Sequence, residues 1–283
     1  MGVGRLYAVR EAEVRVRTCG DDRPVPTQDI AGAVRWRMLL VLLLVAGLWA
    51  GLQNTLAGGG SFITLPALIV SGMSPLAANI TSTVALFPGQ VTSGFAGRSL
   101  VSGVGRLSFR ALFILSLAGG ALGGLLLLNT PPTVFARLVP WLVLFATGVF
   151  AWGSFRRRPL EGTAHIGPRT AAVAQFLIGI YGGYFGGGIG FLMLAALTLA
   201  GLPTRNAGAT KNALASVMNA AAVVLFVASP QVHWLQAAVL GGGAIVGGLA
   251  GTWALKRVNE RALRVAIVCL GVALTIGLFV RPI

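Results

Sequence analysis

The chain has 283 residues, 55% of them hydrophobic and only 10% charged, and its mean hydropathy is +0.83. Because soluble domains carry roughly 25% charged residues, this composition excludes a single soluble core. The formal net charge of +15 is compatible with nucleic-acid binding, but the arginines lie in the N-terminal tail and between apolar segments. That distribution follows the positive-inside rule, so we expect a lipid bilayer as partner and no nucleic acid.

Residues 1–37 are polar and contain seven arginines and five of the seven acidic residues, with the sequence PVP at 24–26. The segment is too long and too polar for the n-region of a signal peptide. Its composition predicts a disordered N-terminal tail. Because the first long apolar run opens at Met38, that methionine is an alternative start of the chain.

Long apolar segments follow the tail, and seven of them have about 20 residues, enough to cross a hydrocarbon layer of about 30 Å as a helix. These segments are 38–57, 76–97, 107–128, 134–155, 205–228, 233–255 and 262–281. Two further pieces, 61–71 and 189–200, are too short to span, and 171–186 is borderline. The pattern predicts an all-α polytopic protein, multi-pass in the cell membrane.

Two of the apolar runs are interrupted by three consecutive glycines, in AGGGSF at 57–62 and in FGGGIGF at 185–191. The sequences that follow them also correspond, because SGMSPLAANITS (71–82) aligns with AGLPTRNAGATK (200–211), 129 residues later. Such internal similarity is typical of transporters built from two copies of one unit.

A later pair of glycine-rich stretches, GGALGG (119–124) and GGAIVGG (242–248), extends the similarity. We therefore predict two pseudo-symmetric transmembrane repeats of about five helical segments each, at 38–155 and 170–283. A basic linker at 156–169 joins them.

The orientation of the repeats is predicted from charge. Basic residues cluster in four connections, at 98–110, 156–169, 205–211 and 255–264, whereas three others carry none, at 72–75, 129–133 and 229–232. If each glycine-broken unit enters the bilayer and returns, all four basic connections lie on one side and the repeats are inverted. The arginine-rich tail then lies on the other side unless the chain begins near Met38. If each unit crosses once, the repeats are parallel and the last basic connection lies on the wrong side, so we favour inversion.

A glycine in a helix interior costs about 1 kcal/mol relative to alanine. Many glycines of the apolar segments are explained by close helix packing. We assign that role to Gly119, Gly120, Gly123, Gly124, Gly243, Gly247 and Gly251. At Gly58–Gly60 and Gly186–Gly188 we favour an unwound backbone, because each run precedes a segment too short to span. Helices that begin near Ser61 and Ile189 would then direct N–H groups and positive dipole ends at a shared site, which favours an anion.

No acidic residue lies in an apolar segment. Symporters driven by sodium or protons usually carry a carboxylate at depth, so we expect uniport or anion exchange, with no metal and no cofactor. Lys211, between Thr210 and Asn212, is the candidate cation for a small anion, and Thr81 and Ser82 hold the matching positions of the first repeat. Extension of Lys211 to a membrane surface is the alternative.

Gln90 and Asn219, 129 residues apart, are isolated amides in apolar sequence. We predict that they face a shared axis and contribute to the substrate site, and hydrogen bonding between helices is the alternative. Four more polar side chains within two turns of the breaks are candidate donors to an oxyanion, with packing as the alternative: Gln53, Asn54, Tyr181 and Tyr184.

The glycine-rich break, followed about fifteen to twenty residues later by a Thr-Ser or Thr-Lys pair and repeated as a unit, resembles the TauE/SafE family of sulfite exporters and related permeases. The resemblance covers approximately residues 38–281. It implies a secondary transporter of small anions, such as sulfite or sulfur-containing organic anions, that works by alternating access and is not an enzyme. Thr-Lys-Asn stands where many members have Thr-Ser, and Ile189 lies opposite Ser61, so the substrate stays open.

The predicted substrate-binding site combines the breaks, the motif positions and the paired amides. Its residues are Gly58, Gly59, Gly60, Ser61, Thr81, Ser82, Gln90, Gly186, Gly187, Gly188, Thr210, Lys211, Asn212 and Asn219.

Two alternatives belong to other functional classes. The first is an intramembrane hydrolase in which Ser61 is the nucleophile and His233 the base, but it leaves the duplication unexplained. The second is a membrane assembly partner without transport activity, which only the packing glycines support. A homodimer is compatible with either alternative and with a transporter.

Overall fold

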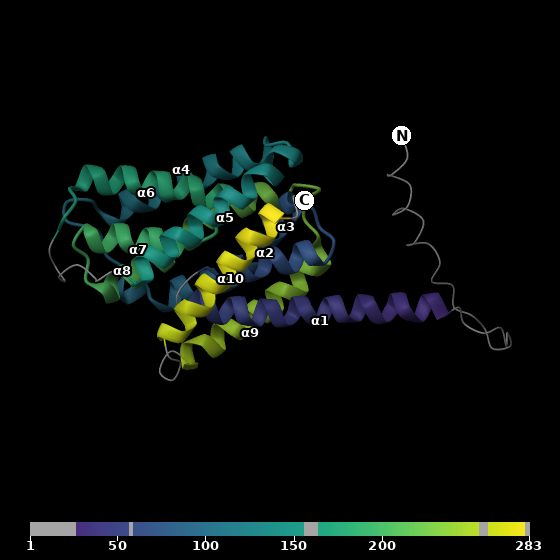
Figure 1. Ribbon diagram of the computed structural model, residues 1–283. Helices are drawn as coiled ribbons and strands as arrows, with labels where there is room; N and C mark the ends of the chain where they lie inside the picture. The colour runs from purple at the N-terminus through teal and green to yellow at the C-terminus, as the bar shows by residue number, and fades with distance from the viewer. Residues whose placement is uncertain (1–26, 57–58, 156–163, 255–259, 281–283) are drawn as a thin grey trace. The chain divides into compact units, whose positions relative to one another are not determined.

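The computed structural model describes residues 27–56, 59–155, 164–254 and 260–280. Within these ranges the chain is helical, and its one extended feature is an isolated bridge between Val104 and Leu107. The helices (Figure 1) are α1 (Thr27–Leu56), α2 (Ser61–Val70), α3 (Pro75–Ala96), the short 3-10 helix η1 (Arg98–Leu100), α4 (Phe109–Leu128), α5 (Pro132–Phe155), α6 (Pro168–Tyr184), α7 (Ile189–Leu199), α8 (Thr204–Phe226), α9 (Trp234–Ala254) and α10 (Glu260–Val280). The all-α prediction is confirmed.

Helix α1 begins at Thr27, well before the first predicted apolar run. The structure therefore differs from the predicted disordered tail over residues 27–37, and the rest of that tail lies outside the described residues. Residues 27–37 include alanine, arginine and glutamine, which are good helix formers, and extending an existing helix avoids the cost of nucleation. The chain divides into the units Met1–Arg37 and Met38–Ile283, and the contacts and the pocket described below lie in the second unit.

Four helical stretches are long and apolar enough to cross a membrane by length and composition: Gly32–Thr55, Phe109–Leu128, Pro132–Trp152 and Thr204–Phe226. Shorter apolar helices occur at Ser61–Val70, Ile189–Leu199, Trp234–Ala250 and Val268–Val280. Helix α3 has a suitable length but contains the buried polar residues Asn79, Thr81 and Ser82, which lower its hydropathy. These helices fit the predicted multi-pass membrane protein.

The short helices α2 and α7 end in the same way. At the end of α2 the N–H of Gly72 donates to Ile69 O at 2.9 Å, and the N–H of the next residue donates to Leu68 O at 3.2 Å. At the end of α7 the N–H of Gly201 donates to Thr198 O at 3.0 Å, again followed by a bond that reaches five residues back. The two C-terminal caps are 129 residues apart and share the Schellman pattern. The two-repeat architecture itself stays a prediction.

Glycines allow the long helices to approach closely, as the sequence predicts. A Cβ atom on Gly123 of α4 would lie 2.1 Å from Ile180 O of α6, and one on Gly120 would lie 2.3 Å from Met218 O of α8. In α9 a Cβ atom on Gly247 would lie 1.8 Å from a carbonyl oxygen of α1. The same crowding applies to Gly119 and Gly243, whereas a Cβ atom on Gly124 would lie 3.2 Å from a side-chain carbon of Leu225. The surroundings of Gly251 lie outside the description.

Aromatic packing holds the first turns of the short helices together. Phe150 of α5 is fully buried and its ring lies 3.9 Å from that of Phe191 in α7, measured between centroids. Phe62 in the first turn of α2 packs edge-on against the same ring, with centroids 6.3 Å apart. Because Phe62 and Phe191 each follow a glycine break, α5 contacts the first turns of both short helices through the ring of Phe150.

Candidate functional site

Both glycine runs interrupt the helices, as predicted. Gly59, between α1 and α2, has φ +83°, and Gly186 and Gly188, between α6 and α7, have φ +76° and +75°. These values lie in the left-handed region, which glycine enters without the steric cost that a Cβ atom imposes. Gly58 lies outside the described residues.

The last turn of α1 binds the first break through two amide side chains. The Gly60 N–H donates to Oδ1 of Asn54 at 2.7 Å, and Nε2 of Gln53 donates to Gly59 O at 2.9 Å. A Cβ atom on Gly60 would lie 2.8 Å from Ala50 O and 2.8 Å from Nδ2 of Asn54. The break is therefore held in one conformation that has no room for a side chain.

The second break leaves two N–H groups in the first turn of α7 without a partner in the described part of the chain. The Phe191 N–H donates to Gly188 O at 3.1 Å, but among the described residues the N–H groups of Ile189 and Gly190 have no acceptor. Unpaired N–H groups in a first turn carry the positive end of the helix dipole.

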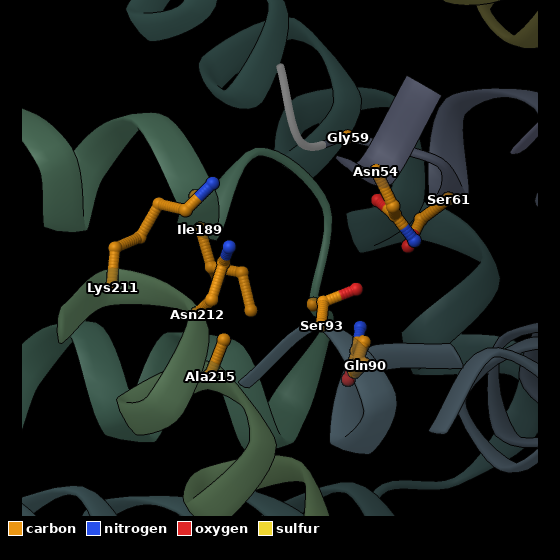
Figure 2. Close-up of a pocket in the computed structure, with 11 residues that line it drawn as sticks. Asn54, Gly59, Ser61, Gln90, Ser93, Ile189, Lys211, Asn212 and Ala215 are labelled. Carbon is orange, nitrogen blue, oxygen red and sulfur yellow. The ribbon is translucent and has the colours of Figure 1, made fainter. Parts of the chain in front are cut away.

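A pocket lies between the two breaks and has a volume of about 40 Å³. We call it the break pocket. Its lining consists of Asn54, Gly59, Ser61, Gln90, Ser93, Gly186, Ile189, Gly190, Lys211, Asn212 and Ala215. Figure 2 shows side chains from α8 on one side of it and side chains from α1, α2 and α3 on the other. Segments from both halves of the sequence therefore surround one small space.

Lys211 is the charged side chain of the break pocket. It is 7% exposed, whereas a lysine that extends to a membrane surface keeps its ammonium group in water. Among the described residues, no carboxylate pairs with it and no acceptor takes a hydrogen bond from it. Because a buried charge without a partner is costly, this ammonium group is a strong candidate to bind an anion.

Gln90 and Asn219 contact each other directly. Nδ2 of Asn219 donates to Oε1 of Gln90 at 2.6 Å, which links α8 to α3. Gln90 lines the break pocket, whereas Asn219 lies behind it, 3% exposed and with Oδ1 unpartnered among the described groups. The amides therefore join two helices, as the alternative interpretation expects, and one of them lines the pocket. Their contribution to substrate binding stays a prediction.

Two threonines at motif positions bind loops. Oγ1 of Thr81 donates to Gln231 O at 3.4 Å and accepts the His233 N–H at 3.2 Å. Oγ1 of Thr210 donates to Ser102 O at 3.3 Å and accepts the N–H of the same serine at 3.1 Å. We call these two contacts the threonine clasps. The two clasps correspond in sequence: Thr210 lies 129 positions after Thr81, and Gln231 lies 129 positions after Ser102.

The structure brings part of the predicted site together. Six predicted residues line the break pocket: Gly59, Ser61, Gln90, Gly186, Lys211 and Asn212. Seven are outside its lining: Gly60, Thr81, Ser82, Gly187, Gly188, Thr210 and Asn219. Ser82 is hydrogen-bonded to Thr64 of α2 instead. His233 is also outside the lining, so the pair required by the hydrolase alternative does not meet in this pocket.

Three residues of the pocket lining were not predicted from the sequence: Ser93, Gly190 and Ala215. One signal was available for Ser93, because it lies three residues after Gln90 on the same face of α3. Its hydroxyl donates to Gly89 O at 2.8 Å, a local bond that serines commonly form in helices.

Replacing Thr210 with valine is expected to lower thermal stability. The change leaves the Ser102 N–H and carbonyl without their partner, and an unsatisfied, partly buried polar group costs about 1–3 kcal/mol. The melting temperature of purified protein in detergent measures the effect. Thr92→Val is the matched control, because that hydroxyl bonds only within its own helix. An equal shift in both variants would contradict a structural role for the clasp.

Comparison with known proteins supplies the biological context. The family model described as "Sulfite exporter TauE/SafE" matches residues 31–278. A probable membrane transporter protein of Sinorhizobium sp. is 30% identical over 248 residues, which is 86% of this chain and 94% of that protein. A probable membrane transporter protein of Haemophilus influenzae is 29% identical over 245 residues, covering 84% and 93% of the two chains.

The probable membrane transporter protein YfcA of Escherichia coli strain K12 is 29% identical over 240 residues, or 82% of this chain and 86% of that protein. No solved structure matches the chain. The family match extends over nearly all of the helical part, and the relatives are described as transporters and not as enzymes. The chain therefore belongs to the TauE/SafE family and is a multi-pass membrane transporter.

Proposed function

We propose that this transporter moves small anions, sulfite or sulfur-containing organic anions, by alternating access at the break pocket. The observation that carries the proposal is the buried Lys211 ammonium group, which lines a pocket between two glycine breaks without a neutralising carboxylate among the described residues. An anion from solution would supply the missing charge.

The other groups around the pocket support an anionic substrate. The free N–H groups of Ile189 and Gly190 lie at the positive end of the α7 dipole, and helix N-termini are established anion sites. A volume of about 40 Å³ suits a few water molecules or one small oxyanion. The sulfur chemistry comes from the family description, which names a sulfite exporter.

The threonine clasps support alternating access. One ties α3 to the segment before α9, and the other ties α8 to the segment before α4. In the inverted arrangement predicted from charge, these contacts lie on opposite sides of the break pocket. Opening one clasp while the other stays closed would expose the pocket to one side at a time. Because no acidic residue lies in an apolar segment, uniport or anion exchange fits better than symport.

Reconstitution in liposomes tests the proposal. Purified protein is expected to move radiolabelled sulfite down its gradient faster than protein-free liposomes allow. Unlabelled sulfite or sulfoacetate in the opposite compartment is expected to accelerate label movement if the protein exchanges anions. A neutral sulfone should not compete. Correctly folded protein that moves none of these anions above background would refute the proposed function.

A further inference from the structure

The orientation of the Asn54 amide is fixed by a backbone group. Its Oδ1 accepts the Gly60 N–H at 2.7 Å. An N–H can only donate, so the Asn54 atom that faces it is the amide oxygen and not the amide nitrogen. The NH₂ group is therefore on the other arm of the side chain.

The NH₂ group of Asn54 has no acceptor among the described residues, although the residue lines the break pocket. Gln90 lines the same pocket, and one end of its amide is occupied by the Asn219 side chain. Asn54 thus has its acceptor occupied by the protein and its donors available. In Figure 2, Asn54 and Gln90 lie on the side of the pocket opposite Lys211.

We propose that Asn54 is a substrate-binding residue that selects head groups whose oxygens all accept hydrogen bonds. The inference rests on the proposed function and extends it to a substrate class, the fully deprotonated sulfite or sulfonate group. Asn54 and Lys211 both offer donors to the pocket. A head group with an O–H would place a donor against these donors and lose affinity, because a buried donor without an acceptor is costly.

The variant Asn54→Asp separates a binding role from a structural one. Aspartate keeps an oxygen for the Gly60 N–H, but a carboxylate oxygen replaces the NH₂ group. The carboxylate also adds a negative charge that repels every anion, so the readout compares two monoanions at mildly acidic pH, methanesulfonate and methylphosphonate, which keeps one O–H. A purely structural Asn54 predicts the wild-type ratio of their affinities in the purified variant. Our proposal predicts a ratio at least tenfold lower, with a melting temperature close to wild type, because the new oxygen accepts from the O–H of methylphosphonate and from nothing on methanesulfonate. A wild-type ratio in Asn54→Asp would overturn it.

A second measurement needs no variant. At mildly acidic pH methylphosphonate retains one proton, whereas methanesulfonate retains none. Wild-type protein is expected to bind methanesulfonate at least tenfold more tightly, and equal affinities would overturn the inference even if Asn54→Asp failed to fold. The failure of the proposed function looks different, because wild-type protein would then bind and transport no anion at all.

Discussion

Replacing Lys211 with glutamine is expected to reduce sulfite flux and affinity by about tenfold to a hundredfold. Losing a hydrogen bond to a charged group costs about 1.5–3 kcal/mol of binding free energy. In a buried site the lost Coulomb attraction adds to that cost. Glutamine is nearly as long as lysine and keeps donors, so the variant removes the charge and little else. Flux in liposomes and the Kd of the anion measure the two effects.

Arg205→Gln is the matched control for this change. Arg205 lies on the same helix but is exposed and outside the break pocket, so its loss should leave flux nearly unchanged. The melting temperature of Lys211→Gln should equal or exceed that of wild type, because the variant removes a buried charge that has no partner in the empty site. Wild-type flux in Lys211→Gln would remove the anion-binding role from this residue.

Replacing Gly60 with alanine is expected to abolish most transport and also to lower stability. The added methyl would lie 2.8 Å from Ala50 O and 2.8 Å from Nδ2 of Asn54, closer than nonbonded atoms approach. The last turn of α1 would have to move away, which would break the Gly60–Asn54 hydrogen bond and distort the pocket wall. Overpacking of this kind costs about 1–3 kcal/mol, and flux should fall more than tenfold.

Gly208→Ala is the control for the break glycine. Gly208 is also a glycine of the membrane region, in α8, but a Cβ atom there would have no atom within 4 Å. We expect this variant to melt at or above the wild-type temperature and to keep its flux. If both alanine variants behaved alike, the conformation of the first break would have no particular importance for transport.

The helices could be predicted from the sequence, because the residues at and between their ends determine where each helix begins and ends. Apolar runs define the long helices, and glycines mark the ends of α2 and α7. The first residue of α1 could not be predicted from the sequence, because residues 27–37 are polar and yet can extend an adjoining apolar helix.

The site was predictable in its outline and not in its details. Alignment of the two glycine runs led to both breaks and to Lys211, which now share a pocket. Thr210 precedes Lys211 directly, so their side chains diverge by about 100° around the helix. One therefore reaches a loop and the other the pocket. Which of two adjacent polar residues faces a site depends on the rotation of the helix against its neighbours, and sequence spacing does not contain that information.

Hydrogen bonding between helices was one of the two interpretations of Gln90 and Asn219, but their direct contact could not be predicted, for a related reason. Their equivalent positions suggested a shared axis, but the 2.6 Å contact requires α3 and α8 to pack side by side, which glycines on neighbouring helices permit. Gly94 of α3, where a Cβ atom would lie 2.7 Å from the Ser216 hydroxyl, shows how closely these two helices approach.

The position of a bound anion in an experimental structure is the most direct test of this account. With sulfite or methanesulfonate at saturating concentration, we expect density within hydrogen-bonding distance of the Lys211 ammonium group, between residues of the first break and the N-terminus of α7. An anion bound elsewhere, with only water between the two breaks, would contradict the central claim that the breaks together form the transport site.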